Sequence, residues 1–429
     1  MAFVRLTVIA SCFFISLCSL PLSVLAEPII FLSTQLNPVE EADKMRKVIL
    51  KEFKGDVEFE PYDDRAVFKR LATQTAETAK RPGLFGALHG DFVSLRREDA
   101  LSGVDDFMAR LKGRKFIESF LTLGRMGEDR QYFIPWMQAT YIMAANRKAL
   151  KYLPKGADIN SLTYEQLRQW AVNMKKEAGE GMLGFPVGTN GLMHRFFQGY
   201  LYPSFTGSTA RRFRSAEAVF MWEFFRDLWG SVNSRSLTFS RMDEPLLAGE
   251  VWVAWDHTAR IIDVFKKRPD DFIAFPVPIG PTGRGFMVVL AGLGLPKDTS
   301  DRAAALDLIE YLTRPEVQVV TLNSVGFYPV VETEGAMELP AGLDRINQAI
   351  SRQGASREAV VALLPVGLAG KGSVFNAVYI EAFSKIVLRK RNASDILAVQ
   401  AAKLEKIFIE TGAQCWPPDE PSEGPCPVE

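Results

Sequence analysis

The sequence is poor in the residues and motifs that most enzymes use for chemistry. It has 429 residues but only three histidines, His89, His194 and His257, which lie far apart. It contains no nucleophile elbow, no zinc-protease helix motif, no Walker phosphate loop and no Cys-x-x-Cys pair. Gly283-Arg284-Gly285 lacks the third glycine of a dinucleotide loop and follows several prolines. The sequence therefore predicts no catalytic residue, no cofactor and no metal.

The chain also lacks a net charge and, after its first residues, a long apolar run. Its 51 basic residues balance its 51 acidic residues. Without a basic excess there is no electrostatic footprint for nucleic acid or for an anionic membrane. About 400 residues remain that are not expected to span a membrane. This is more than one compact hydrophobic core usually holds, so we expect two domains.

The N-terminus resembles a targeting segment. Arg5 precedes the apolar run 6–17, and Val24-Leu25-Ala26 ends in small or aliphatic residues suited to cleavage after Ala26. Residues 1–26 are therefore predicted to be a cleaved signal peptide, and the mature protein is expected in the periplasm. The alternative is an uncleaved membrane anchor, although the run is short for a span.

Few cysteines remain after such a cleavage. Only Cys415 and Cys426 are left, in a proline-rich tail that starts at residue 413. An oxidising compartment favours a disulfide between them, which would close a short loop. The alternative is two free thiols, and two cysteines without a nearby histidine are too few ligands for a metal.

The segment 245–331 is the most informative part of the sequence. Gly249 suits the left-handed turn after a helix, and the apolar run 251–255 follows it as a short buried strand. Prolines and glycines over 276–285 predict a crossover. A helix is expected from Asp301, and Pro315 suits the first turn of the next helix. Alone, these features indicate an α/β protein.

In their order, these features resemble the carbohydrate-binding, maltose-binding-protein-like family of solute-binding proteins of bacterial ABC importers. The matching motifs lie at 275–283, 305–318 and 326–329. The opening strand–helix–strand–helix–strand order over 28–88, with a helix expected over 65–78, fits the same family.

The resemblance implies a two-lobe periplasmic binding protein fold of type II, with hinge crossovers near 135–141, 278–286 and 328–331. The N-lobe would comprise 27–135 plus 287–328, and the C-lobe 141–285 plus 331–429. It also implies a monomeric receptor that makes or breaks no bond, binds a sugar or oligosaccharide, and delivers it to an ABC permease in the inner membrane.

A sugar site needs planar polar side chains for hydroxyls and aromatic rings for the C–H face. Such residues occur in the loops expected to face the ligand, with Trp255 favoured as the stacking ring and Trp252 assigned to packing. The candidate ligand-binding residues are Gln35, Asp64, Asp91, Trp136, Gln138, Trp255, Asp256, Arg284, Phe375 and Tyr379.

Two other functions remain open from the sequence. A receptor of the same fold for glycerol phosphate, a polyamine or ferric ion is one, although the scattered tyrosines do not suggest an iron site. A secreted glycoside-active enzyme is the other, because carboxylate pairs occur at 63–64, 105–106 and 270–271.

Export gives the first testable prediction. The intact mass of protein recovered from the periplasm should correspond to a chain that starts at Glu27, because the small residue at Ala26 permits cleavage there. A membrane-bound protein that keeps residues 1–26 would contradict the signal-peptide interpretation.

Overall fold

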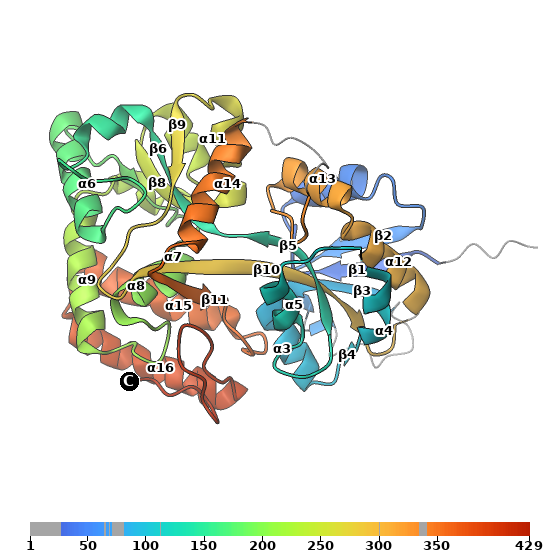
Figure 1. Ribbon diagram of the computed structural model, residues 1–429. Helices are drawn as coiled ribbons and strands as arrows, with labels where there is room; N and C mark the ends of the chain where they lie inside the picture. The colour runs from blue at the N-terminus through green and yellow to red at the C-terminus, as the bar shows by residue number, and fades with distance from the viewer. Residues whose placement is uncertain are drawn as a thin grey trace, which may run out of the picture.

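The computed structural model describes most of the chain in two α/β lobes (Figure 1). The described residues are 27–63, 66–67, 69–70, 81–111, 113–299, 301–333 and 341–429. The expected signal peptide and most of the helix expected over 65–78 lie outside these ranges.

The sheet of the first lobe begins with three parallel strands. β1 (Ile29–Ser33) pairs in parallel with β2 (Val57–Pro61) and β3 (Leu84–Leu88). Every residue of β1 is buried, which is the pattern of a parallel strand covered on both faces. β10 (Arg284–Pro296) runs antiparallel to β3, and β5 (Phe133–Ala139) runs antiparallel to β10.

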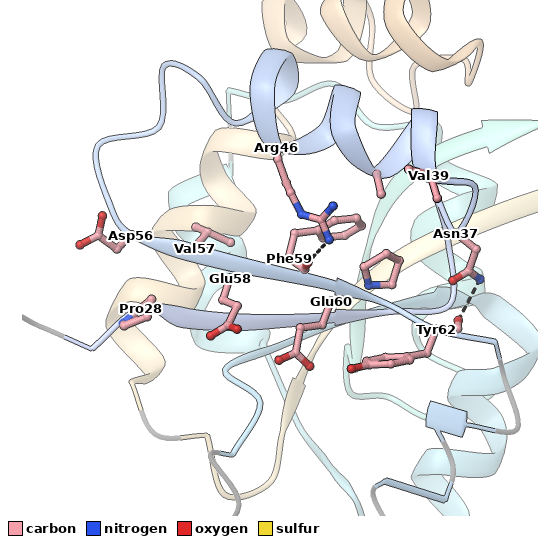
Figure 2. A pocket seen from close by; sticks show the side chains of 12 residues that line it. Pro28, Asn37, Val39, Arg46, Asp56, Val57, Glu58, Phe59, Glu60 and Tyr62 are labelled. Atoms are coloured by element: carbon pink, nitrogen blue, oxygen red, sulfur yellow. Dashed lines mark hydrogen bonds between the residues drawn. The ribbon is translucent and has the colours of Figure 1, made fainter.

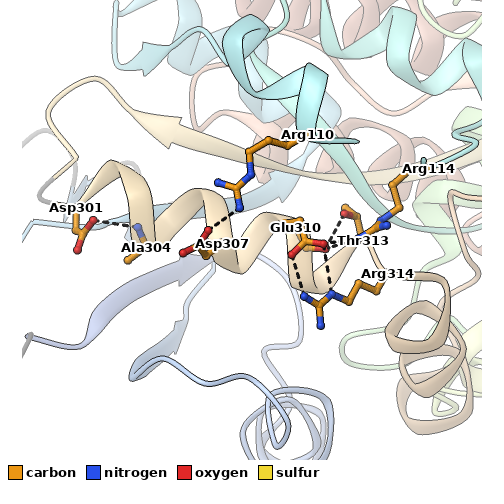
Figure 3. A network of polar contacts seen from close by, with 8 residues as sticks. All are labelled: Arg110, Arg114, Asp301, Ala304, Asp307, Glu310, Thr313 and Arg314. Carbon is orange, nitrogen blue, oxygen red and sulfur yellow. Dashed lines mark hydrogen bonds and ion pairs between the residues drawn. The ribbon is translucent and has the colours of Figure 1, made fainter. Parts of the chain in front are cut away.

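Helices cover this sheet and are tied together by ion pairs. Glu310 of α12 (Arg302–Leu312) accepts from Arg114 at 2.6 Å and from Arg314 at 2.9 Å, and Arg110 pairs with Asp307 (Figure 3). The other helical segments of the lobe are α1 (Val39–Lys44), η1 (Met45–Ile49), α3 (His89–Arg97), α4 (Asp105–Met108), η2 (Ala109–Leu111), α5 (Glu118–Gly124) and α13 (Pro315–Val325). β4 (Leu101–Ser102) pairs with the end of β10.

The second lobe has its own sheet, in the order β7-β8-β6-β9. Its strands are β7 (Leu183–Gly184), β8 (Val253–His257), β6 (Tyr141–Asn146) and β9 (Phe272–Phe275). Its helical segments are η3 (Arg147–Tyr152), α6 (Tyr164–Ala178), α7 (Met193–Phe196), η4 (Phe197–Leu201), α8 (Tyr202–Thr206), α9 (Ala216–Trp229), η5 (Ser234–Leu237), α10 (Asp243–Ala248), α11 (Thr258–Lys267), α14 (Ala341–Gly354), α15 (Gly372–Phe383), η6 (Ser384–Leu388) and α16 (Ala393–Thr411).

Local sequence explains several boundaries. Pro315 opens α13 as expected, and Gly326 ends it with φ at 78°. Gly249 ends α10 with φ at 76°, but the following strand starts at Val253 and not at residue 251. The cause is that Glu250 and Val251 still donate their N–H groups to the carbonyl of Pro245, so the helix-terminal turn extends further.

Three segments connect the lobes. Thr140 alone separates β5 from β6, and Tyr328 exchanges backbone hydrogen bonds with Gln138 beside it. The third connection is β10 itself, whose first half pairs with β11 (Ala359–Leu363) and whose second half pairs with β3 and β5. Figure 1 shows this strand running from one lobe into the other. The change of partners lies at 288–289, shortly beyond the segment expected from the sequence.

The C-terminal tail is anchored to the second lobe. Cys415 and Cys426 form a disulfide, and the buried Asp419 lies inside the loop that it closes. The Asp419 carboxylate accepts the backbone N–H groups of Thr209 at 2.9 Å, Ala210 at 2.9 Å and Arg211 at 3.1 Å. One carboxylate thus satisfies three donors of the turn that follows α8.

Removing this carboxylate should destabilise the second lobe. In Asp419→Ala the buried N–H groups lose their acceptor, so we expect the free energy of unfolding to fall by about 3 kcal/mol. Chemical denaturation of the purified mature protein measures this change. Glu420→Ala, at the exposed neighbouring position, is the control and should be close to neutral. Equal stability of the two variants would contradict the anchoring role.

Candidate functional site

Two adjoining cavities lie between the lobes. Their volumes are about 270 Å³ and about 360 Å³. Both are lined by residues of the first lobe and of the second lobe, and several residues line both of them. The shared residues are Thr34, Gln35, Asn37, Leu88, Arg195 and Leu364. The cavities therefore form one continuous space, called the cleft below.

The wall from the first lobe is formed where β1 and β3 end. After β1, the side-chain amide of Gln35 donates to Thr34 Oγ1 at 3.0 Å, and that of Asn37 donates to the Tyr62 carbonyl at 2.8 Å. After β3, Gly90 and Asp91 lie in the first turn of α3. Because parallel strands end at the same edge of a sheet, these polar groups come together there.

The wall from the second lobe comes from β8, α11 and α7. His257 ends β8 and caps α11, accepting the Ala259 N–H on Nδ1 at 3.2 Å. Arg260, in the first turn of α11, donates to the Ser240 carbonyl at 2.8 Å. Arg195 of α7 donates to Gln198 Oε1 at 3.1 Å and lines both cavities.

A loop of the second lobe, 364–371, borders the cleft and touches the first lobe. Gly90 lies so close to it that a Cβ there would be 2.0 Å from the Pro365 carbonyl oxygen. The Ala369 N–H donates to Ser94 Oγ at 3.0 Å, on α3. These contacts close one side of the cleft.

Burial and charge set the protonation of the cleft. Burial, followed by the repulsion of Arg260 and Arg195, lowers the pKa of His257 to about 3, so its ring is neutral at physiological pH. Burial also raises the pKa of Glu41, and the positive charges of Arg241, Lys44 and Arg260 offset only part of that rise. Behind this wall, burial raises the pKa of Asp256 to about 6, against the attraction of Arg260.

The structure brings two of the expected ligand residues to the cleft. Gln35 and Asp91 line it, whereas Asp64 lies outside the described residues. The remaining expected residues do not line either cavity and are engaged elsewhere. They are Trp136, Gln138, Trp255, Asp256, Arg284, Phe375 and Tyr379.

Four of these are fully buried rings, and three of the four, Trp136, Phe375 and Tyr379, pack away from the cleft. Trp136 packs on Phe31 in the core of the first lobe, with ring centroids 5.4 Å apart. Phe375 packs against Trp416 of the tail at 5.6 Å, and the Tyr379 hydroxyl donates to a backbone carbonyl. In the structure these rings pack in the interior of their lobes and do not line the cleft. Large rings are buried there because this removes their apolar surface from water.

Three others are polar residues that form hydrogen bonds within the chain, although the buried Nε of Arg284 has no partner among them. The Gln138 amide donates to the Pro329 carbonyl at 2.7 Å and thereby links two of the connections between the lobes. Arg284 donates to the Asn160 carbonyl at 2.6 Å, at the far end of β10. Asp256 accepts two backbone N–H groups. Each therefore supports the scaffold.

Trp255, the favoured stacking ring, lies beneath the cleft. It is completely buried and stacks on Tyr141 at 4.8 Å with the planes 5° apart. Tyr141, not Trp255, lines the cleft. Trp252 is half-buried and stacks on Tyr152 at 5.5 Å.

Sequence reasoning missed most of the second wall. Arg195, His257, Arg260 and Asn376 were not among the expected residues, although all line the cleft. A signal existed for His257 and Arg260, because ligands of α/β sheets bind beyond the carboxyl ends of strands. The sequence-based strand ended at residue 255, whereas β8 ends at residue 257. A strand predicted to end at residue 257 would have pointed to His257 and Arg260.

A larger groove lies at the edge of the first lobe. Its volume is about 830 Å³, and Figure 2 shows it along β2, beneath α1 and η1. Arg46 crosses it and donates to the Phe59 carbonyl at 2.8 Å. Only one lobe lines this groove, and it lies along an edge strand, so we place the site in the smaller cleft.

Within the described ranges, no group of three or more histidine, cysteine or acidic side chains is arranged to hold a metal ion. No helix in the same part of the chain is long and apolar enough to cross a membrane.

Comparison with known families decides the class of the protein. Residues 38–319 match the family described as bacterial extracellular solute-binding protein, which is more than half of the chain. The chain belongs to this family. Its members are binding proteins that work outside the cytoplasm. No curated protein matches the sequence.

Solved structures of solute-binding proteins share the fold. UgpB from Mycobacterium tuberculosis, in complex with glycerophosphocholine, has a TM-score of 0.70 and 18% identity, over 90% of this chain and 99% of that one. The GacH receptor of Streptomyces glaucescens, solved unliganded and with acarbose, has a TM-score of 0.69 and 16% identity, over 89% of this chain and 98% of that one. Maltose-bound MalE3 from T. maritima has a TM-score of 0.68 and 18% identity, over 89% of this chain and 99% of that one. The two-lobe type II fold expected from the sequence is thereby confirmed.

The burial of Trp255 gives a testable prediction. Trp255→Ala should lower the free energy of unfolding by about 3–5 kcal/mol, since it removes a fully buried ring from a packed core. Trp252→Ala is the matched control on the same segment and should cost less, because its ring is half-buried. Melting curves of both variants measure the difference. A larger loss in the Trp252 variant would contradict the packing described here.

Proposed function

We propose that this protein is the receptor of an ABC importer that binds a small, hydroxyl-rich solute of the carbohydrate class in the cleft. One observation carries the proposal: the cleft is walled by both lobes and lies beside the segments that connect them. The sugar ligands of GacH and MalE3, which share the fold, support the carbohydrate class.

The cleft offers hydrogen-bonding groups suited to a polyol. On the first wall, Thr34, Gln35 and Asn37 carry a hydroxyl and planar amides, and Asp91 carries a carboxylate. Such groups can each accept from or donate to hydroxyls in fixed directions. On the second wall the Asn376 amide, whose oxygen accepts from Gln198 at 2.9 Å, has its NH₂ group available for a solute.

Transport would use closure of the lobes and no covalent step. The connecting segments are narrow, since Thr140 alone separates β5 from β6 and β10 passes between the lobes as a single strand. A solute that contacts both walls binds the closed form more tightly and shifts the population toward it. The closed form would then be the one that docks on the membrane permease.

Several finer assignments belong to this proposal. The mature protein would start at Glu27, reside in the periplasm and act as a monomer without nucleic acid. The lobe boundaries would follow the sequence-based ones, except that the β10 connection would lie at 288–289, where the strand changes partners. The rival function is a secreted glycoside-active enzyme; incubation with glycans followed by product analysis separates the two, and released sugar would favour the enzyme.

Closure on binding can be measured directly. With a saturating solute, small-angle scattering should give a smaller radius of gyration than without it, because the lobes rotate together around the bound solute. A screen of mono- and oligosaccharides by melting temperature supplies the solute. Superimposable scattering curves at saturation would count against a hinged receptor.

A further inference from the structure

The cleft contains few rings on which a neutral sugar could stack. The chain has seven tryptophans, and within the described ranges none of them lines the cleft. The rings that do, from Tyr141, His257 and Phe327, are 3%, 7% and 8% exposed. A neutral sugar gains much of its affinity from an exposed ring against its C–H face. The affinity of this site must come mainly from polar and charged groups.

The charges of the cleft are divided between its walls. The acidic side chains that line it, Glu41, Asp63 and Asp91, all belong to the first lobe. The basic side chains, Arg195 and Arg260, both belong to the second lobe. In the part of the chain that the structure describes, no acidic side chain lines the cleft from the second lobe. A bound solute therefore meets acceptors on one side and cations on the other.

The wall of the second lobe presents hydrogen-bond donors. Arg260 donates to the carbonyls of Ser240 and Asn190. Glu41 and Asp256 attract it electrostatically, but none of the described carboxylates lies within ion-pair distance of it. Because Nδ1 of the neutral His257 accepts the Ala259 N–H, its proton lies on Nε2, which makes that atom a donor. The first turn of α11, ten residues long, adds its partial positive charge beside Arg260.

We propose that the solute of this receptor carries an anionic group, a carboxylate or a phosphate, next to its hydroxyls. The anion would rest on Arg260 and on Nε2 of His257, with Arg195 adding positive charge to the same wall, and the hydroxyls would donate to polar side chains of the first lobe. The inference rests on the proposed function, since it names the charge of the solute in the same cleft. Guanidinium groups bind both anions well, so the shared chemistry is the anionic oxygens.

Matched pairs of compounds test this inference on the full mature protein. Glucose, galactose and mannose are each compared with their uronic acid and their 6-phosphate by melting temperature, and then by calorimetry. At least one acid or phosphate should bind more tightly than its neutral parent, and added salt should weaken that binding. The uronic acids and the phosphates distinguish the two sources of the anion.

Variants of Arg260 locate the anion. Arg260→Gln should weaken binding of the charged compound by at least about tenfold, because a charge-assisted hydrogen bond is lost. Arg260→Lys should retain part of the affinity, which keeps the test valid if the glutamine variant folds poorly. Arg147→Gln is the matched control, since Arg147 is exposed outside the cleft and also donates to a carbonyl, that of Asp270.

The outcomes separate this inference from the proposed function. If neutral sugars bind as tightly as their acids and phosphates, the inference of an anionic solute is refuted, whereas the proposed receptor function is supported. If a charged compound binds but Arg260→Gln binds it like Arg147→Gln, the assigned wall is refuted. If no compound of the panel binds, both the anionic class and the carbohydrate receptor are contradicted.

Discussion

The hydrogen bonding of β10 is the constraint on which the two-lobe arrangement depends. Its residues 284–288 pair with β11 in the second lobe, and 289–294 pair with β3 and β5 in the first. One strand thus belongs to both halves of the molecule, and any rotation between lobes must be absorbed near residue 288. The cleft residue Val289 lies at this change of partners, so the proposed hinge and the proposed binding space would coincide.

The C-terminal tail supports the cleft from behind. The Leu363 N–H, at the end of β11, donates to the Pro417 carbonyl inside the disulfide loop at 3.0 Å. Leu363 leads directly into the loop 364–371, which lines the cleft and touches α3. The disulfide-closed tail is therefore part of the scaffold that positions one border of the cleft.

The sequence predicted the fold far better than the site. Helix boundaries such as Pro315 and Gly326 depend on local backbone preferences, which a single sequence reveals. Which side chains reach the cleft depends on strand ends and on packing between distant segments. A two-residue error in β8 was enough to favour Trp255, which is buried, over His257, which lines the cleft. Gln35 and Asp91 do line the cleft, because the sequence placed the ends of β1 and β3 correctly.

Hydrogen–deuterium exchange in the presence of bound solute tests the central claim, that the cleft between the lobes is the binding site. With the panel compound that raises the melting temperature most, we expect slower exchange in the segments that wall the cleft, namely 34–37, 88–91, 192–195, 257–260 and 364–372. Protection confined to the groove along β2, or unchanged exchange in all five segments at saturation, would contradict the account.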